Sequence, residues 1–173
     1  MWKLGKRSKK VYESGLHEDL QRIIDMACVA CPIDFGLTSG VRTAEQQFKL
    51  FKIGRAYIGG DGDTSDPSNW NQIKSSVATY LDGYEKKSNH QKKDDGFGYA
   101  IDFIAYVEGQ SQLMYDHVHM AAIIGSFMTC ASILYHEGKI THMLRSGADW
   151  DGDTRWLEPG TFQDLPHLEL IEP

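Results

Sequence analysis

The chain has 173 residues, of which 41% are hydrophobic and 24% charged, and this fits one globular domain with its own core. Its net charge of −6 argues against nucleic acid as a partner, because phosphate backbones are bound by clustered Lys and Arg. The one basic concentration lies at the N-terminus and is expected to be a solvated tail, with contact to an anionic surface as the alternative; it comprises Lys3, Lys6, Arg7, Lys9 and Lys10.

The N-terminal residues contain no apolar run of the secretory kind, so we expect synthesis in the cytoplasm without a signal peptide. The most apolar segment, residues 120–135, is shorter than the about 20 residues that span a bilayer. We therefore expect a buried core helix there and no stable membrane insertion.

The first half of the chain shows helical and strand periodicity in turn. Apolar residues recur at helical spacing over residues 16–30, and residues 33–41 have the pattern of a strand. A second helix is predicted over residues 43–53, with Thr43 as its N-cap and Gly54 at its end.

A long region without a strong pattern, residues 54–87, follows the second helix. Residues 54–72 are rich in Gly, Asp, Ser and Pro and are predicted to be loop, and a short helix is predicted over residues 72–81. Three aromatic residues in or beside this loop are expected to form a small core of their own, with a ligand groove as the alternative: Trp70, Tyr80 and Tyr84.

The second half of the chain is predicted to add three strands and the longest helix. The strands cover residues 99–106, 140–145 and 167–171, and the helix runs from about residue 115 to 136. Since helices and strands do not alternate regularly, the expected fold class is α+β, a single domain over residues 1–173 with a small antiparallel sheet flanked by helices.

Asp102 is unexpected in the strand predicted over residues 99–106, because an unpaired buried carboxylate is costly and needs a cation or a metal beside it. With His90 and His167 it would form a three-ligand zinc site with one open position, the pattern of catalytic zinc. A bend at the intervening proline would bring Asp164 to the same point as a spare carboxylate. On spacing alone, a surface His90 and a salt-bridged Asp102 are an equally good interpretation.

Three acidic residues, Asp149, Asp151 and Asp153, alternate as the first three ligands of a calcium loop do. The glycine that such a loop needs next is replaced by Thr154. A second divalent cation site is one interpretation, and a solvated acidic turn is the other.

Three motifs occur in the chain in a fixed order, and together they resemble those of D-alanyl-D-alanine carboxypeptidases and related phage endolysins. The first resembles S-G-x-R-S/T followed by a glutamine, the second S-x-H-x-x-G-x-A-x-D, and the third D/E-x-x-H. Here they are Ser39-Gly-Val-Arg42-Thr43 with Gln47, Ser88-Asn-His90 with Gly98-Tyr-Ala100-Ile-Asp102, and Asp164-Leu-Pro-His167.

Within that group the chain is most similar to the L-alanyl-D-glutamate endopeptidase endolysins of tailed phages, through residues 4–24 and the RSGADWDGD stretch at 145–153. The resemblance implies a hedgehog/D-Ala-D-Ala peptidase-like fold that binds one Zn²⁺ per chain. It implies these roles: His90, Asp102 and His167 as ligands; Asp164 as general base; Arg42 for the oxyanion or a substrate carboxylate; and Gln47 and Ser88 for substrate binding.

The chain departs from the second motif by an insertion. Seven residues, 91–97, separate His90 from Gly98, where the motif has two. Their charged side chains lack an apolar anchor, so we expect a loop at the rim of the cleft that contacts substrate but not metal.

The activity implied by the resemblance is hydrolysis of the peptidoglycan stem peptide, at the bond between L-alanine and D-glutamate, for host cell lysis. The enzyme would be a monomer that reaches the cell wall after release from the cytoplasm. The alternatives are a D-Ala-D-Ala carboxypeptidase or dipeptidase, and a zinc-stabilised binding domain without catalysis. Retention of Asp164 and Arg42 speaks against the last, since a structural zinc needs neither.

Overall fold

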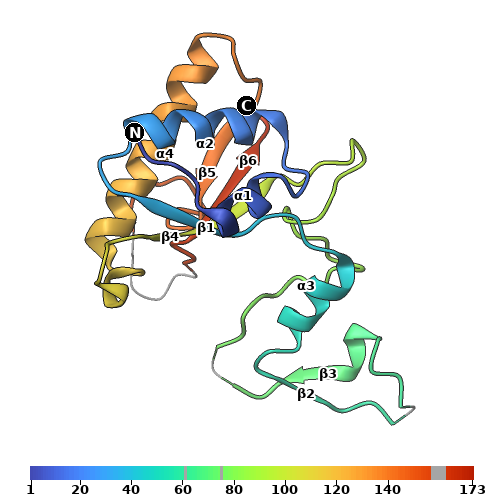
Figure 1. Ribbon diagram of the computed structural model, residues 1–173. Coiled ribbons are helices and arrows are strands. Elements are labelled where there is room, and N and C mark those ends of the chain that lie inside the picture. Colours follow the sequence, from blue (N-terminus) through green and yellow to red (C-terminus); the bar gives the residue numbers. More distant parts are fainter. Residues whose placement is uncertain (61, 75, 157–162) are drawn as a thin grey trace.

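The centre of the protein is a four-stranded antiparallel sheet with strand order β1-β4-β6-β5 (Figure 1). The computed structural model describes residues 1–60, 62–74, 76–156 and 163–173. The strands of this sheet are β1 (Phe35–Ser39), β4 (Ala100–Ala105), β5 (Met143–Ser146) and β6 (His167–Ile171). The predicted α+β class is confirmed, with β5 beginning three residues later than expected.

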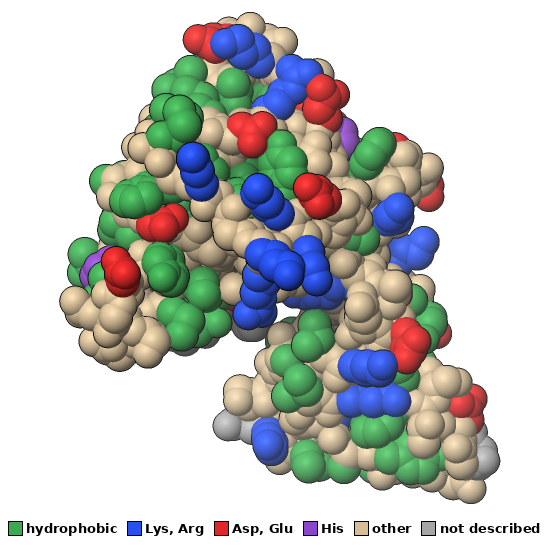
Figure 2. All heavy atoms as spheres, in the orientation of Figure 1, with side chains coloured by type: hydrophobic (Ala, Val, Ile, Leu, Met, Phe, Trp, Pro, Cys, Tyr) green, Lys and Arg blue, Asp and Glu red, His purple; other side chains and the backbone are tan. Residues whose placement is uncertain are grey.

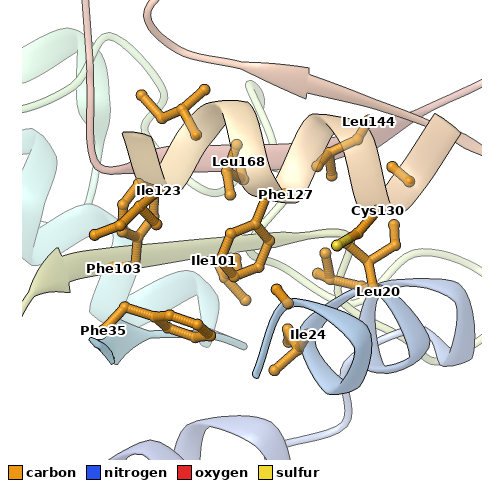
Figure 3. Close-up of a cluster of buried hydrophobic side chains, with 14 of the residues drawn as sticks. Leu20, Ile24, Phe35, Ile101, Phe103, Ile123, Phe127, Cys130, Leu144 and Leu168 are labelled. Atoms are coloured by element: carbon orange, nitrogen blue, oxygen red, sulfur yellow. The ribbon is translucent and has the colours of Figure 1, made fainter. Parts of the chain in front are cut away.

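Two helices, α2 (Glu18–Ala30) and α4 (His117–His136), pack against each other and cover one face of the sheet. Alternation along β4 sends Ile101 and Phe103 to this face, where both are fully buried. Figure 3 shows how these side chains meet those of the two helices, among them Leu20, Ile24, Ile123 and Phe127. The other face of the sheet, which carries Asp102, is therefore left for the site.

Helix α4 extends beyond both ends of the apolar segment at residues 120–135. It has 20 residues and a mean hydropathy of 1.6 over its most apolar window, so its length and composition alone would permit a membrane span. Seven of its side chains are instead buried in the core of this fold: Met120, Ile123, Ile124, Phe127, Cys130, Ala131 and Leu134. The helix thus has the core position that was predicted for it.

The basic N-terminal segment is a helix, α1 (Lys6–Tyr12), rather than the expected solvated tail. Its Lys and Arg side chains are exposed, as expected, but the opposite side of the helix packs on β1. Ser8 is buried there and its Oγ accepts a hydrogen bond from the backbone N–H of Leu37 at 3.0 Å. The charge pattern alone did not reveal these contacts, because they are made by Ser8, which lies between the cations, and by Val11, which follows them.

A smaller lobe holds α3 (Ala44–Phe51) and a hairpin of β2 (Arg55–Tyr57) and β3 (Trp70–Gln72), with a short 3₁₀ turn, η1 (Pro67–Asn69), before β3 (Figure 1). A second short 3₁₀ turn, η2 (Ser111–Leu113), lies in the main body before α4. Thr43 caps α3 as predicted, within a capping box completed by Gln46. The hairpin corrects the prediction that residues 54–72 are only loop. Its strands are short, and Gly-, Asp- and Ser-rich sequence conceals them.

The lobe has an aromatic core of its own around Phe48, whose ring lies 5.5 Å from Tyr84 and 6.4 Å from Trp70, centroid to centroid. This confirms the small core expected for Trp70 and Tyr84. The helix predicted over residues 72–81 is absent from its described residues, 72–74 and 76–81. The segment is held instead by side chains that donate to its carbonyls: Gln47 Nε2 to Leu81 at 3.0 Å and Arg55 Nη1 to Thr79 at 3.0 Å.

Candidate metal centre and cleft

The candidate site lies on the sheet face opposite the helices and follows one row across three strands. Asp102 in β4 is the register partner of Ser39 in β1 on one side and of His167 in β6 on the other. His90 reaches the same point from the loop that precedes β4. Strand pairing therefore brings together the aspartate and two histidines singled out in the sequence.

The three predicted ligand atoms form an equilateral triangle. His90 Nε2, Asp102 Oδ1 and His167 Nδ1 are each 3.2 Å from the other two. Ligand atoms of a tetrahedral zinc, with bonds of about 2.0–2.2 Å, lie about 3.3–3.6 Å apart. The triangle thus fits one face of such a tetrahedron and would leave a fourth position toward the cleft. These residues can hold a divalent metal, as two imidazoles and one carboxylate.

Each histidine is oriented by a hydrogen bond from its other ring nitrogen. His90, which is 1% exposed, donates from Nδ1 to the carbonyl of Gly40 at 2.8 Å, so its Nε2 lone pair faces the triangle. His167 has its Nε2 3.1 Å from Glu169 Oε2, and its Nδ1 faces the triangle. Such outer partners fix the tautomer and ring orientation of metal-binding histidines.

Glu169 is the centre of this outer support. Its side chain accepts hydrogen bonds from Asn89 Nδ2 at 2.7 Å and from Arg145 Nε at 3.0 Å. Burial by itself would raise the pKa of Glu169, but the hydrogen bonds from His167, Asn89 and Arg145 lower it to about 2. The sequence reasoning missed Asn89 and Arg145. The sequence did contain a signal for Glu169 itself: it lies two residues after His167 in a strand, so both side chains are on one face of β6.

Arg42 is the cation that lies beside Asp102. Its Nη2 contacts Asp102 Oδ2, while its Nε donates to Ser39 Oγ at 2.9 Å and its Nη1 to Gln47 Oε1 at 3.3 Å. Burial would raise the pKa of Asp102, yet hydrogen bonds from His167 and His90 and the charge of Arg42 hold it well below its usual range. Asp102 is therefore an anion at neutral pH.

The two histidines have opposite pKa shifts in this environment. Burial lowers the pKa of His90, which favours the neutral imidazole. Burial acts in the same direction on His167, but its hydrogen bonds to Asp102 and Glu169 outweigh it and raise the pKa to about 9. Metal binding at this triangle would displace a proton from His167, because only the neutral ring can be a ligand.

Asp164 reaches the site by the bend that the sequence predicted. The backbone N–H of His167 donates to the Asp164 carbonyl at 2.9 Å, which closes a turn, and the Asp164 N–H donates to Gly147 at 2.8 Å. A Cβ at Gly147 would lie 2.3 Å from the Asp164 carbonyl oxygen, so this close approach requires glycine. Burial and the charge of Asp102 raise the pKa of the Asp164 carboxyl.

The two remaining predicted site residues lie close by. Ser88 borders the cleft, and its Oγ accepts a hydrogen bond from the N–H of His90 at 3.3 Å. Gln47 is 1% exposed and lies beneath Arg42, with its amide group engaged by Arg42, Thr79 and Leu81. That Ser88 and Gln47 bind substrate stays a prediction. The position of Gln47 favours an indirect effect through Arg42.

The triangle borders a cleft of about 590 Å³ between the sheet and the smaller lobe, and the two lobes stand apart in the space-filling view (Figure 2). Asp164, Arg42 and all three candidate ligands line it. Its other lining residues include Tyr80, Leu81, Asn89, Tyr115, Arg145, Trp150 and Glu169.

The insertion at 91–97 does not line this cleft, so the expectation of a rim loop is wrong. Lys93 Nζ lies 3.8 Å from the centroid of the Tyr99 ring, and Asp95 Oδ2 accepts a hydrogen bond from the Tyr99 hydroxyl at 2.8 Å. Phe97 meets the ring of His17 at 6.0 Å. These contacts fold the loop toward the start of α2 instead of toward the cleft.

Two further groups of potential metal ligands are present among the described residues. Asp149, Asp151 and Asp153 bring carboxylate oxygens within 4.8 Å of one another, and the N–H of Thr154 donates to Asp149 Oδ2 at 3.1 Å. The second group is His17, Asp19 and His142, where Asp19 Oδ2 already accepts four hydrogen bonds from Thr141 and His142.

No family model and no curated protein sequence matches the chain. Its fold is that of an endopeptidase of known structure. The Serratia marcescens L-Ala D-Glu endopeptidase ChiX superposes on it with a TM-score of 0.58 and 19% sequence identity, over 96% of this chain and 87% of that one. The likeness extends over nearly the whole length of both proteins and includes the smaller lobe within the aligned span.

Proposed function

We propose that the chain is a zinc-dependent peptidoglycan peptidase that cleaves the stem peptide between L-alanine and D-glutamate. The observation that carries the proposal is the triangle of His90, Asp102 and His167 on the cleft wall, with Asp164 and Arg42 beside it. The fold shared with an L-Ala D-Glu endopeptidase supports the same conclusion.

The bound metal would supply Lewis acidity, and zinc can lower the pKa of a water molecule to about 7. The protein would supply the ligand set through His90, Asp102 and His167. A closed shell of protein ligands would suit a structural site, so the position left open toward the cleft favours catalysis over a binding domain.

Asp164 is the proposed general base. It borders the cleft without being a member of the triangle, and burial raises its pKa toward the working pH. A carboxylate so placed can take the proton of an attacking water and return it to the departing amine. Glu169 is less suited to this role, because its carboxylate is engaged by His167, Asn89 and Arg145.

Arg42 is the proposed positive charge for the oxyanion that forms at the scissile carbonyl, or for a carboxylate of the substrate. Its guanidinium stays charged at any relevant pH. Ser39, Gln47 and Asp102 hold three of its nitrogen atoms, so its position is set before substrate arrives.

The biological setting is part of the proposal. The likeness of residues 4–24 and 145–153 to phage endolysins supports a monomeric lysis enzyme that is made in the host cytoplasm and acts on the wall after release. The group formed by Asp149, Asp151 and Asp153 is proposed as a second divalent cation site.

Mass spectrometry of purified peptidoglycan digested by the zinc-loaded protein tests the activity. We expect new fragments that end in L-alanine and begin with D-glutamate. Release of terminal D-alanine would instead identify a carboxypeptidase. No new termini from a protein that carries zinc would identify a binding domain, and either result would contradict the proposal.

A further inference from the structure

A second hollow adjoins the cleft on the side of α1. It has a volume of about 430 Å³ and shares Thr38, Arg42 and Leu50 with the cleft as common lining residues. Helix α1 contributes two cations to it, Arg7 and Lys10. The groove that starts at the candidate metal centre therefore continues past Arg42 into a basic compartment.

The charge of this compartment is uniformly positive. Its lining contains Arg7, Lys10 and Arg42 and no aspartate or glutamate. Arg42 is paired with Asp102, whereas Arg7 and Lys10 form no ion pair with any described residue. Figure 2 shows Lys and Arg side chains gathered on the main body next to the gap between the two lobes. Such a concentration of unpaired cations in a hollow attracts an anion.

The helix that carries these cations is firmly attached to the sheet. Ser14 Oγ accepts a hydrogen bond from the N–H of Val41 at 3.1 Å, and Ser8 Oγ does the same for Leu37 at 3.0 Å. A Cβ at Gly40 would lie 2.9 Å from Val11 Cγ1, so α1 packs directly on this residue. The carbonyl of Gly40 also holds the ring of His90. Arg7 and Lys10 thus lie on a helix that is fixed beside Gly40, the residue that orients His90.

We propose that Arg7 and Lys10 form a subsite for a carboxylate on the leaving-group side of the scissile bond. This inference rests on the proposed function. A glutamyl residue whose amino group lies in the scissile bond has two carboxyl groups, and only one of them can extend the peptide. The other stays free, close to the bond that is cut, and its charge matches the compartment.

The subsite also sets the direction of the substrate in the groove. The glutamyl half would lie toward α1, past Arg42. The alanyl half and the glycan attached to it would lie along the part of the cleft that the basic compartment does not share, which includes Tyr115 and Trp150. Aromatic side chains suit sugars and small apolar groups better than carboxylates.

The test compares two synthetic stem peptides that differ only in this group, a free carboxylate or a carboxamide. The variant is the double substitution Arg7→Gln with Lys10→Gln. The matched control is Lys6→Gln with Lys9→Gln, which removes the same charge from the same helix at two exposed positions outside the compartment. An exposed charge pair contributes a factor of about 1.5 to 5, so two pairs together give the wild type roughly a two- to 25-fold preference in kcat/KM for the acid.

We expect the preference to fall to about one in the Arg7/Lys10 variant and to persist in the control. Equal loss in both variants would mean general attraction by the basic helix, and no preference in the wild type would mean no subsite. Either result overturns the inference. Calorimetric binding of the glutamyl product, as acid and as amide, separates this question from catalysis. A wild type that hydrolyses neither peptide refutes the proposed function, and the binding preference still decides whether the carboxylate subsite exists.

Discussion

Replacement of Glu169 by glutamine tests whether the support behind His167 controls metal binding. Glu169 is 4% exposed, and its two oxygens serve different partners: Oε2 receives Asn89 and faces His167, and Oε1 receives Arg145. A glutamine has one oxygen and one NH₂ group, so it can satisfy only one side.

Both orientations of the new amide are unfavourable. With its NH₂ toward Arg145, two donors face each other and the guanidinium loses its buried partner. With its NH₂ toward His167, the ring is driven to the tautomer with the proton on Nδ1, the atom that faces the triangle. An unsatisfied buried group costs about 1–3 kcal/mol. Loss of an outer partner of a metal-binding histidine weakens affinity about 10- to 100-fold, which agrees with that range.

We therefore expect Glu169→Gln to raise the zinc Kd about 10- to 100-fold, measured by competition with a chelator of known affinity at pH 7.5. The control is Glu108→Gln, which removes the same charge at an exposed position after β4. Circular dichroism checks that both variants are folded. A folded Glu169→Gln protein with a Kd within about threefold of the wild type would refute the assigned role of Glu169 in orienting His167.

Three further predictions concern the same site and one hydrogen-bonded carboxylate outside it. Elemental analysis should find one zinc per chain in the wild type and none in His90→Ala or His167→Ala, and full occupancy in both variants would contradict the ligand assignment. Asp164→Asn should keep zinc and fold but lose activity about 10²- to 10⁴-fold, as judged by peptidoglycan digestion, and wild-type rates would exclude it as the base. Burial alone would raise the pKa of Asp19, but hydrogen bonds from His142 and Thr141 outweigh it and lower that pKa. The ionised Asp19 carboxylate therefore stabilises the fold fully above its unfolded-state pKa, and this stabilisation is lost as the pH falls through its folded-state pKa. The difference in Tm between the wild type and Asp19→Asn should therefore be smaller below about pH 4 than at pH 7, and a difference that does not change with pH would contradict this linkage.

The sequence drew attention to the candidate metal centre through Asp102, because a carboxylate among apolar strand residues requires a partner. Spacing alone left a salt bridge as an equally good interpretation, and the motif resemblance selected His90 and His167 as its companions. The structure adds the row from Ser39 through Asp102 to His167, which depends on the pairing of three strands. That register could not be read from strand patterns alone, since short strands pair in several ways.

The residues that orient the candidate ligands were harder to predict than the candidate ligands themselves. Arg145 meets Glu169 because β5 and β6 pair in a register that places these two residues opposite each other. Neither residue is unusual in the sequence, where each reads as an ordinary charged residue in a strand. Gln47 was noticed only through a motif, and its contacts with Arg42, Thr79 and Leu81 explain why a glutamine is needed there.

The insertion at 91–97 leaves the candidate ligands undisturbed because both of its ends are fixed. Gln91 is tied to the cleft side, where its Oε1 accepts from the Ser88 N–H at 2.9 Å and its Nε2 donates to the Gly83 carbonyl at 2.8 Å. Gly98 is tied to the start of α2 by hydrogen bonds with Gly15 and His17, each 2.9 Å long.

Between those two anchors the loop can lengthen at little cost, since each doubling of loop length costs only about 0.6 kcal/mol in closure entropy. A Cβ at Gly98 would lie 2.6 Å from Val41 Cγ2, so the second anchor tolerates no side chain. The segment that can vary is therefore 92–96, and Gln91 belongs with the turn that carries His90. Added length in this loop extends the protein beside α2, away from the cleft, and so it alters neither the triangle of candidate ligands nor the lining of the cleft.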